Sequence, residues 1–428
     1  MESNFVKGKY PKFLKFNKDT PNDNDINLIV HGQGVFVFEN TDNSKLCSFN
    51  LFNKDKSDGF IVDFTLESVL VNRIAILEPL VNTKASGSTI GLTNINGAYY
   101  WFSIDSQNQK FYAGIGEPRL ETMTYEYAFS FNDKNLREKN KLFLESLTHI
   151  KINKQSTAIS LLKLIRDPIT LSIAQIVKNT DELSMDIIAS GKYLPKSNLS
   201  PTAQILYDCI SGKNFVLNTP DFPDFSKAIE YSIATKGLWC NKRLKEKTDE
   251  FSKTKPNIYE TYLRITLGQN NGESPGIPYV MEIWPVGHYS PIHNHSEANA
   301  IIRVLHGTIN VRLYPFLCTS GVPPFANVNF VKDDITWISP NLNQTHKLEN
   351  IESSKETCIT IQCYMYENND IAHYDYFDYI DADGQRKQYE PDSDMDFVEF
   401  KERMKKEWDS RPKQTLCDKI RRCFSSSK

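Results

Sequence analysis

Two stretches of the chain alternate short apolar runs with polar turns, and the stretch between them has a different pattern. From 27 to 131, runs such as GFIVDFTL and AYYWFSI are separated by clusters of Asn, Asp, Gly and Lys. From 258 to 366 the pattern returns in runs such as YVMEIWPVG and ETCITIQCYMY. Short runs of β-branched and aromatic residues bounded by turn residues predict a sandwich or a barrel. We therefore expect a mainly β protein with two all-β domains.

The intervening and terminal segments favour helices and irregular structure. DKNLREKNKLFLESLTHI, KAIEYSIATKGLWCNKRLKEKTDEF and DFVEFKERMKKEWDS have helical spacing. Pro220 and Pro223 remove backbone donors and restrict the residues before them, which is typical of a linker. The predicted organisation is an N-terminal all-β domain at 1–132, a helical or irregular connection at 133–225, a second β domain at 226–390, and a helix with a disordered basic tail at 391–428.

Composition narrows the classes of partner. The net charge of −3 over 428 residues gives no basic excess, so we expect no nucleic-acid partner. No apolar run approaches the roughly 20 residues that span a bilayer, so we expect no integral membrane segment. The N-terminus lacks the pattern of a signal peptide, and the eight cysteines contain no CxxC. We expect reduced thiols and a cytoplasmic protein.

Histidines carry the strongest chemical signal. Six of the eight lie between 288 and 373. His293 and His295 form an HxH pair, and residues i and i+2 of a strand point to the same face. His346, followed four residues later by Asn350, supplies a third imidazole. Three histidines leave coordination positions open, as catalysis requires, and imidazole suits iron, copper, zinc and nickel.

The residues around these histidines resemble the two motifs of the cupin family. Gly287 precedes the HxH pair by six residues, Gly307 closes the segment, and a proline-containing turn precedes the H-x-x-x-N box. This resemblance implies a double-stranded β-helix, or jelly-roll, barrel around the metal. Cupins often add a glutamate ligand seven residues before the closing glycine, where this chain has Ala300. A three-histidine site is therefore expected. For His288 and His306 we expect surface or turn positions, and His373 lies beyond the barrel.

A three-histidine cupin resembles the thiol dioxygenases, and the likeness to cysteine dioxygenase extends further. WPVGHYSPIHNHSEANA is similar to that family's ligand segment, Tyr262 and Arg264 match its Tyr-x-Arg, and Tyr364 matches its active-site tyrosine. The resemblance implies Fe(II) on the three histidines, Arg264 on the substrate carboxylate, and Tyr364 as a hydrogen-bonding group. The implied reaction converts a small thiol such as cysteine, with O2, to a sulfinic acid.

Two positions depart from that family. Ala300 excludes the thioether cross-link of the animal enzymes. Gln362 replaces the histidine of the Ser-x-His-x-Tyr relay, with Thr360 at the serine position, and glutamine cannot exchange a proton near neutral pH. Two other functions therefore stay open. One is a cupin oxygenase or isomerase that acts on a non-thiol with another divalent metal, and the other is a non-catalytic metabolite-binding module.

The N-terminal β region carries less chemistry. AYYWFSIDSQNQKFYAGIGEPRLETMTYEYAF loosely resembles the β modules called farnesoic acid methyltransferase-like, but no glycine-rich nucleotide motif accompanies it. The turn from Gly114 to Glu117 is expected to be a hairpin, and a role in binding an unknown ligand or partner is the working interpretation. In the basic tail, Cys417 and Cys423 are possible palmitoylation sites, and a disordered tail is the simpler expectation.

Overall fold

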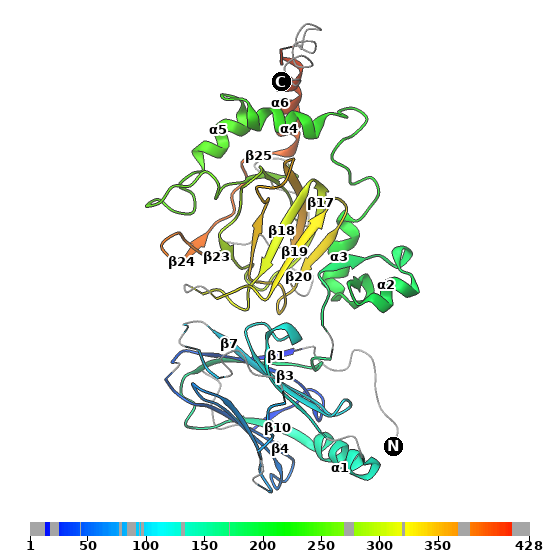
Figure 1. Ribbon diagram of the computed structural model, residues 1–428, viewed down its shortest axis with the longest axis vertical. Helices are drawn as coiled ribbons and strands as arrows, with labels where there is room; N and C mark the ends of the chain where they lie inside the picture. Colours follow the sequence, from blue (N-terminus) through cyan, green and yellow to red (C-terminus); the bar gives the residue numbers. More distant parts are fainter. Residues whose placement is uncertain are drawn as a thin grey trace, which may run out of the picture.

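Two β-sheet bodies are stacked along the long axis of the molecule in the computed structural model (Figure 1). We call them the N-terminal sandwich (β1–β11) and the jelly roll (β14–β25). The structure describes residues 13–17, 25–42, 44–76, 79–83, 91–93, 95, 98–129, 133–170, 172–268, 278–318, 322–366 and 377–412. Over these residues, no helix has the length and apolarity needed to cross a membrane, and no disulfide joins the cysteines.

The N-terminal sandwich consists of two antiparallel sheets that face each other. One sheet has the order β1 (Phe13–Asn17), β11 (Ile159–Ile165), β3 (Gln33–Asn40), β7 (Tyr99–Asp105), β8 (Lys110–Ile115), β9 (Met123–Ala128). The other has the order β2 (Ile26–Asn27), β10 (Leu147–Ile152), β4 (Cys47–Asn53), β5 (Gly59–Phe64), β6 (Val69–Arg73). Aromatic pairs join the sheets, because the ring centroid of Phe38 lies 4.8 Å from Phe49 and 4.9 Å from Phe64.

Two strands of this sandwich come from the stretch 133–225, which the sequence pattern had indicated as a helical or irregular connection. Its first part is the expected helix, α1 (Lys134–Glu145), capped by Asp133. β10 and β11 then pair with β4 and β3, each as the strand next to the edge of its sheet. Ile150 and Leu162 are buried in the core, so their alternating apolar residues are used as strands.

The remainder of that stretch covers the jelly roll. It contains β12 (Ile176–Lys178), η2 (Thr180–Glu182), α2 (Met185–Ser190), β13 (Tyr193–Pro195), η3 (Lys196–Asn198) and α3 (Pro201–Ile210). Helix α3 buries Ala203, Leu206 and Ile210 in the same core as β17 and β22 of the jelly roll. The connection is therefore packed against the second body.

The jelly roll also has two six-stranded sheets. One has the order β20 (Ile335–Ile338), β17 (Asn299–His306), β22 (Cys358–Met365), β15 (Tyr279–Trp284), β14 (Leu263–Thr266), β25 (Met395–Asp396). The other has the order β19 (Ala326–Val331), β18 (Thr308–Leu313), β21 (His346–Glu349), β16 (Ile292–His293), β23 (Phe377–Ile380), β24 (Arg386–Tyr389).

The chain crosses repeatedly between these two sheets. β15, β17, β20 and β22 lie in one sheet, whereas β16, β18, β21 and β23 lie in the other. This alternation is the double-stranded β-helix of a jelly roll, so the prediction of a mainly β protein with a cupin-type second domain is confirmed. The sheets remain separate over the described strands and do not close into one continuous barrel.

Helices cover the outer face of one jelly-roll sheet. α4 (Phe225–Ala234), α5 (Trp239–Glu246) and α6 (Phe397–Asp409) lie at the end of the molecule away from the N-terminal sandwich (Figure 1). They bury Phe225, Cys240 and Phe400 against the core that contains β14 and β22. Because it is covered on both faces, β22 has all eight residues buried.

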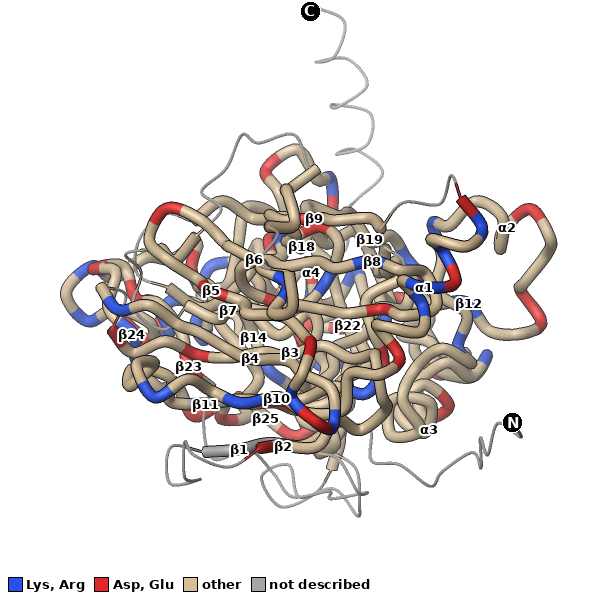
Figure 2. The backbone as a smooth tube through the Cα atoms, turned by 90° about the horizontal axis from the view of Figure 1, so that it is seen from below, with Lys and Arg blue, Asp and Glu red and all other residues tan. Residues whose placement is uncertain are grey.

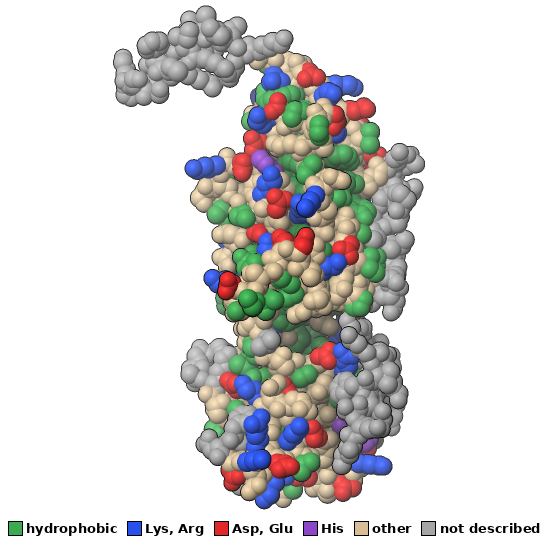
Figure 3. All heavy atoms as spheres, turned by 90° about the vertical axis from the view of Figure 1, so that its right-hand side faces the viewer, with side chains coloured by type: hydrophobic (Ala, Val, Ile, Leu, Met, Phe, Trp, Pro, Cys, Tyr) green, Lys and Arg blue, Asp and Glu red, His purple; other side chains and the backbone are tan. Residues whose placement is uncertain are grey.

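The two bodies touch through close contacts at a narrow waist, which is visible in the space-filling view (Figure 3). Phe316, from the segment between β18 and β19, is buried in the core of the N-terminal sandwich. Gly116 has φ +92°, and a Cβ there would lie 2.5 Å from the backbone oxygen of Pro315, so only glycine permits this approach. On the opposite, lower end of the sandwich, acidic and basic residues are interspersed (Figure 2).

Candidate metal centre

The three histidines of the two cupin motifs come together inside the jelly roll. His293 ends β16, His346 begins β21, and these two residues are register partners in the sheet. We expected the HxH pair to lie on one strand, but β16 ends at His293 and His295 lies in the following loop. The chain turns there because Ser296 and Glu297 adopt positive φ angles of 48° and 65°.

The imidazole nitrogens are spaced as ligands of one cation would be. All three histidines offer nitrogen atoms within 4.8 Å of one another. Nε2 of His295 lies 3.2 Å from Nε2 of His346. Two nitrogens about 2.1 Å from a common metal are about 3.0 Å apart at a right angle and about 3.4 Å apart at the tetrahedral angle. The separation of this pair lies between these values, so the two nitrogens are spaced as ligands of one divalent metal, and the His293 imidazole lies within reach of the same position.

Backbone contacts set the orientation of two of the rings. Nδ1 of His293 lies 3.1 Å from the carbonyl oxygen of Pro291, and Nδ1 of His346 lies 3.0 Å from that of Asn343. A proton on each Nδ1 leaves the Nε2 lone pair available to a metal. Nδ1 of His295 is buried and has no hydrogen-bond partner within the described chain.

Burial keeps all three imidazoles neutral. It lowers the pKa of His293 to about 3, with further lowering by His346. It lowers the pKa of His346 to about 4 and that of His295 well below its usual range. Neutral imidazole is the form that binds metals, so the site needs no deprotonation at physiological pH.

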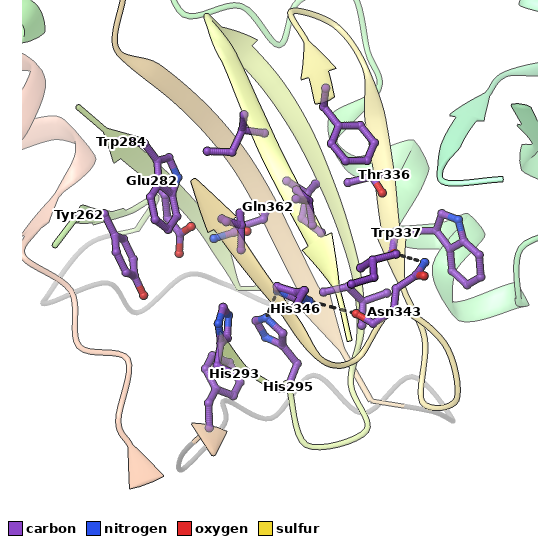
Figure 4. Close-up of a pocket in the computed structure, with 18 of the residues that line it drawn as sticks. Tyr262, Glu282, Trp284, His293, His295, Thr336, Trp337, Asn343, His346 and Gln362 are labelled. Carbon is purple, nitrogen blue, oxygen red and sulfur yellow. Dashed lines mark hydrogen bonds between the residues drawn. The ribbon is translucent and has the colours of Figure 1, made fainter. Parts of the chain in front are cut away.

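A small cavity of about 50 Å³ opens beside the histidines. One water needs roughly 10–15 Å³ by this measure, so the space suits a ligand of a few heavy atoms. Much of the wall is apolar: Ile302, Val304, Ile309, Val311, Leu313, Val328, Phe330, Ile338 and Leu348. Figure 4 shows the histidines at one side of the cavity, with Tyr262, Glu282 and Trp284 grouped together beside them.

Arg264 lines the cavity but already has an acidic partner. Its Nη1 lies 3.1 Å from Oε1 of Glu282, the residue directly opposite on β15. Both side chains are buried. Burial raises the pKa of Glu282, and Arg264 and Gln362 oppose this shift. Nε of Arg264 has no hydrogen-bond partner in the described part of the chain, so one donor of the guanidinium is still available.

Tyr262 and Tyr364 flank this charge pair. The Tyr262 ring stacks on Trp284 with centroids 4.2 Å apart, and Tyr364 stacks on His295 at 5.5 Å. Burial raises the pKa of both phenols well above the usual value, so each keeps its proton at neutral pH. The nearby Arg264 guanidinium opposes part of the rise in the Tyr364 pKa.

Gln362 and Thr360 lie on the same face of β22 as Tyr364. All three are buried, and Gln362 lines the cavity beside Glu282. Oγ1 of Thr360 has no hydrogen-bond partner among the described residues, so this Thr-x-Gln-x-Tyr series is not joined into a continuous relay. Ala300 stands opposite Tyr364 in the β17–β22 register, where a larger side chain would meet the phenol.

The remaining motif residues support the fold around the centre. The Asn350 side chain donates to the carbonyls of Trp284 and Glu356, and so ties two loops together outside the cavity. His288 lies in a turn, as expected, but is buried with Nδ1 2.9 Å from the Thr261 carbonyl. His306 is half-buried, and its Nε2 lies 3.4 Å from Oε2 of Glu356. The position of His373 falls outside the described residues.

Two residues that contact the site were missed by the sequence analysis: Glu282, which lines the cavity, and Gln344, which binds the loop of His295. Glu282 is the single charged residue in the apolar run YVMEIW, and alternation places it on the same face as Trp284, which is a usable signal. Gln344 stands two residues before His346, and its Oε1 accepts the backbone N–H groups of His295 and Glu297 at 3.3 Å each. Nothing in the local pattern distinguishes Gln344 from its neighbours.

Comparisons with known proteins give weak likenesses to cupins. The sequence matches no protein-family model and no curated protein. A cupin 2 domain-containing protein from Halorhodospira halophila is 14% identical, with a TM-score of 0.20 over 36% of this chain and 86% of that chain. The cupin domain of Schizosaccharomyces pombe Cnp3 is also 14% identical, with a TM-score of 0.20 over 25% of this chain and 65% of that chain.

An enzyme is among the similar solved structures. Cellulomonas parahominis L-ribose isomerase is 14% identical, with a TM-score of 0.20 over 25% of this chain and 62% of that chain. The matched region therefore spans less than two thirds of both the isomerase and the Cnp3 chains. At such scores the likenesses carry no argument of their own, and the cupin-type fold of this chain rests on its strand order.

Proposed function

We propose that the protein is a non-haem Fe(II)-dependent dioxygenase that oxidises a small thiol, of the class of cysteine, to its sulfinic acid. The observation that carries the proposal is the set of three neutral, buried histidines without a carboxylate, beside a cavity for a few heavy atoms. Arg264 and Tyr364 face the same cavity, as the resemblance to cysteine dioxygenase requires.

The reaction balances without another redox partner. Both atoms of O2 are added to sulfur, the sulfur loses four electrons, and O2 gains four. His293, His295 and His346 would hold Fe(II), which supplies the redox chemistry that O2 needs. The apolar part of the wall disfavours water in the cavity, and Tyr364, whose raised pKa keeps it protonated, would offer a hydroxyl group to the ligand.

The Arg264–Glu282 pair refines the expected substrate. A carboxylate approaching Arg264 meets Glu282 as well, and two like charges in a buried site repel. A zwitterion presents an ammonium group to Glu282 and a carboxylate to Arg264. We therefore propose cysteine ahead of 3-mercaptopropionate, which has no ammonium group, and of cysteamine, which has no carboxylate.

Oxygen consumption by protein loaded anaerobically with Fe(II) tests the proposal. We expect uptake with cysteine, formation of the sulfinic acid, and loss of both activity and iron in His346→Ala. No uptake with cysteine, cysteamine or 3-mercaptopropionate, while a known thiol dioxygenase is active in parallel, contradicts the thiol assignment.

The compensated charge of Arg264 favours one second candidate. A cupin enzyme that acts on a neutral, non-thiol ligand with another divalent metal would use the same histidines. Such an enzyme would not need Arg264 to bind a substrate carboxylate. Metal analysis of protein purified without added metal separates the two functions. Iron supports the dioxygenase, whereas nickel, zinc or manganese supports the second candidate.

A further inference from the structure

The hairpin between β8 and β9 of the N-terminal sandwich reaches the loop that precedes His346. The two carboxylate oxygens of Glu117 accept the backbone N–H groups of Asn343 and Gln344, each at 2.7 Å. Glu117 is buried, and Arg119 beside it donates to Oδ1 of Asn343 at 2.9 Å. A carboxylate from one body thus holds consecutive peptide groups of the other body.

The held segment contacts a histidine of the metal centre directly. The carbonyl oxygen of Asn343 lies 3.0 Å from Nδ1 of His346, and this contact orients the ring. Figure 4 shows the contact as a dashed line between the two residues. Movement of the Asn343 backbone would therefore turn the His346 imidazole and shift its Nε2.

Gln344 extends the connection to the second ligand loop. Its Oε1 accepts the N–H groups of His295 and Glu297, and its Nε2 donates to the carbonyls of Ala298 and Ser339 at 2.8 and 2.7 Å. The backbone of Gln344 is bound by Glu117, so the same carboxylate secures the residue that joins the two loops.

The loop after His295 has a second contact with the N-terminal sandwich. Ser296 and Glu297 have positive φ angles, a conformation that non-glycine residues adopt at a cost, and surrounding contacts must hold it. Nζ of Lys163 on β11 lies 3.4 Å from Oε1 of Glu297. Because the Glu297 side chain is 51% exposed, this ion pair stabilises the conformation of the loop less than the buried contacts of Glu117 do.

We propose that the N-terminal sandwich positions the ligands of the metal centre, with Glu117 as a positioning residue for His346 and His295. Glu117 acts on His346 through Asn343 and on the His295 loop through Gln344. The inference rests on the metal site of the proposed function and is independent of the reaction that the metal serves. It gives the N-terminal sandwich a role without requiring a ligand of its own.

Titration of the metal-free full-length protein with Co²⁺ tests this proposal. Loss of groups that orient metal ligands typically weakens metal binding about 10–100-fold, and we expect this loss in Glu117→Ala. Glu117→Gln keeps one acceptor oxygen and should fall between Glu117→Ala and the parent. Lys163→Met removes the ion pair with the half-exposed Glu297 carboxylate and should weaken binding no more than about fivefold.

Asp105 provides the matched control within the same sandwich. It is buried and accepts the backbone N–H groups of Gln107 and Asn108 at 3.0 and 2.9 Å, but these belong to its own turn. Asp105→Ala should lower the stability of the sandwich and leave the Kd for Co²⁺ within about twofold of the parent value.

The visible absorption bands of the Co²⁺-saturated proteins give a second readout, because they report the arrangement of ligands around the ion. We expect them to change in Glu117→Ala and to match the parent in Asp105→Ala. Unchanged Kd and bands in Glu117→Ala overturn the inference and leave the metal site standing. Equal losses in Glu117→Ala and Asp105→Ala overturn it as well, since they indicate a general effect of folding. A parent that binds no Co²⁺, Zn²⁺ or Fe(II) overturns both the inference and the metal site.

Discussion

Glu282→Gln probes the buried charge pair at the side of the cavity. Arg264 is 6% exposed and Glu282 is 5% exposed, and their closest atoms are 3.1 Å apart. Glutamine retains the size and one acceptor but leaves the guanidinium uncompensated. Removal of one partner from a buried pair costs about 3–5 kcal/mol, which corresponds to a melting temperature lower by roughly 6–20 °C for a domain of this size.

Urea unfolding followed by tryptophan fluorescence measures this loss, because Trp284, which stacks on Tyr262, lines the same cavity as the pair. The double variant Arg264→Met/Glu282→Leu removes both charges and should recover most of the stability that Glu282→Gln loses. Glu399→Gln breaks an ion pair with Arg403 whose side chains are 60% and 45% exposed, and this control should cost at most about 1 kcal/mol.

A carboxylate ligand should partly repair the Glu282→Gln variant. Charge-assisted hydrogen bonds contribute about 1.5–3 kcal/mol, so the preference for 3-mercaptopropionate over cysteine should rise by roughly 10–150-fold relative to the parent. The ratio of the kcat/KM values for 3-mercaptopropionate and cysteine measures this preference. A loss of stability below about 1 kcal/mol, together with an unchanged ratio, would refute the assigned role of this pair.

Three further predictions concern pH, backbone strain and the phenol. Burial raises the pKa of Glu117 to about 7 from 4.5, so the folded state binds this proton more tightly than the unfolded state. The stability of the parent relative to Glu117→Gln should therefore fall by up to roughly 3 kcal/mol as the pH rises from 4.5 to 7, and urea unfolding at several pH values that shows a constant difference would contradict it. Gly307→Ala places a Cβ 2.6 Å from the Thr357 carbonyl oxygen at φ +71°, whereas Gly191→Ala at φ +64° meets nothing within 4 Å. Gly191→Ala should cost about 1 kcal/mol in urea unfolding and Gly307→Ala clearly more, and equal costs would exclude a steric effect. Tyr364→Phe should lower kcat for cysteine about 10–100-fold, as expected for a lost hydrogen bond, with metal content unchanged; an unaltered kcat would remove the phenol from the mechanism.

The sequence was sufficient to predict those elements and candidate ligands whose pattern lies within a short stretch of the chain. An HxH pair and an H-x-x-x-N box place imidazoles at set distances along the chain, and the apolar alternation of short runs identifies most strands. Helices α1, α4, α5 and α6 were likewise predicted from their spacing. β10 and β11 were not assigned to the N-terminal sandwich, because tertiary pairing with β4 and β3 decides where a short apolar run is placed.

Residue type and spacing in the sequence indicated three imidazoles as candidate metal ligands, and the resemblance to cysteine dioxygenase added an arginine and a phenol as candidate site residues. Only the tertiary structure decided how those groups are tuned. Glu282 meets Arg264 through the register of two neighbouring strands, and Glu117 meets Asn343 across 226 residues of chain. Such contacts depend on how the sheets and the two bodies pack. An unpaired buried charge is costly, but this cost arises only after the fold has buried the charge beside its partner.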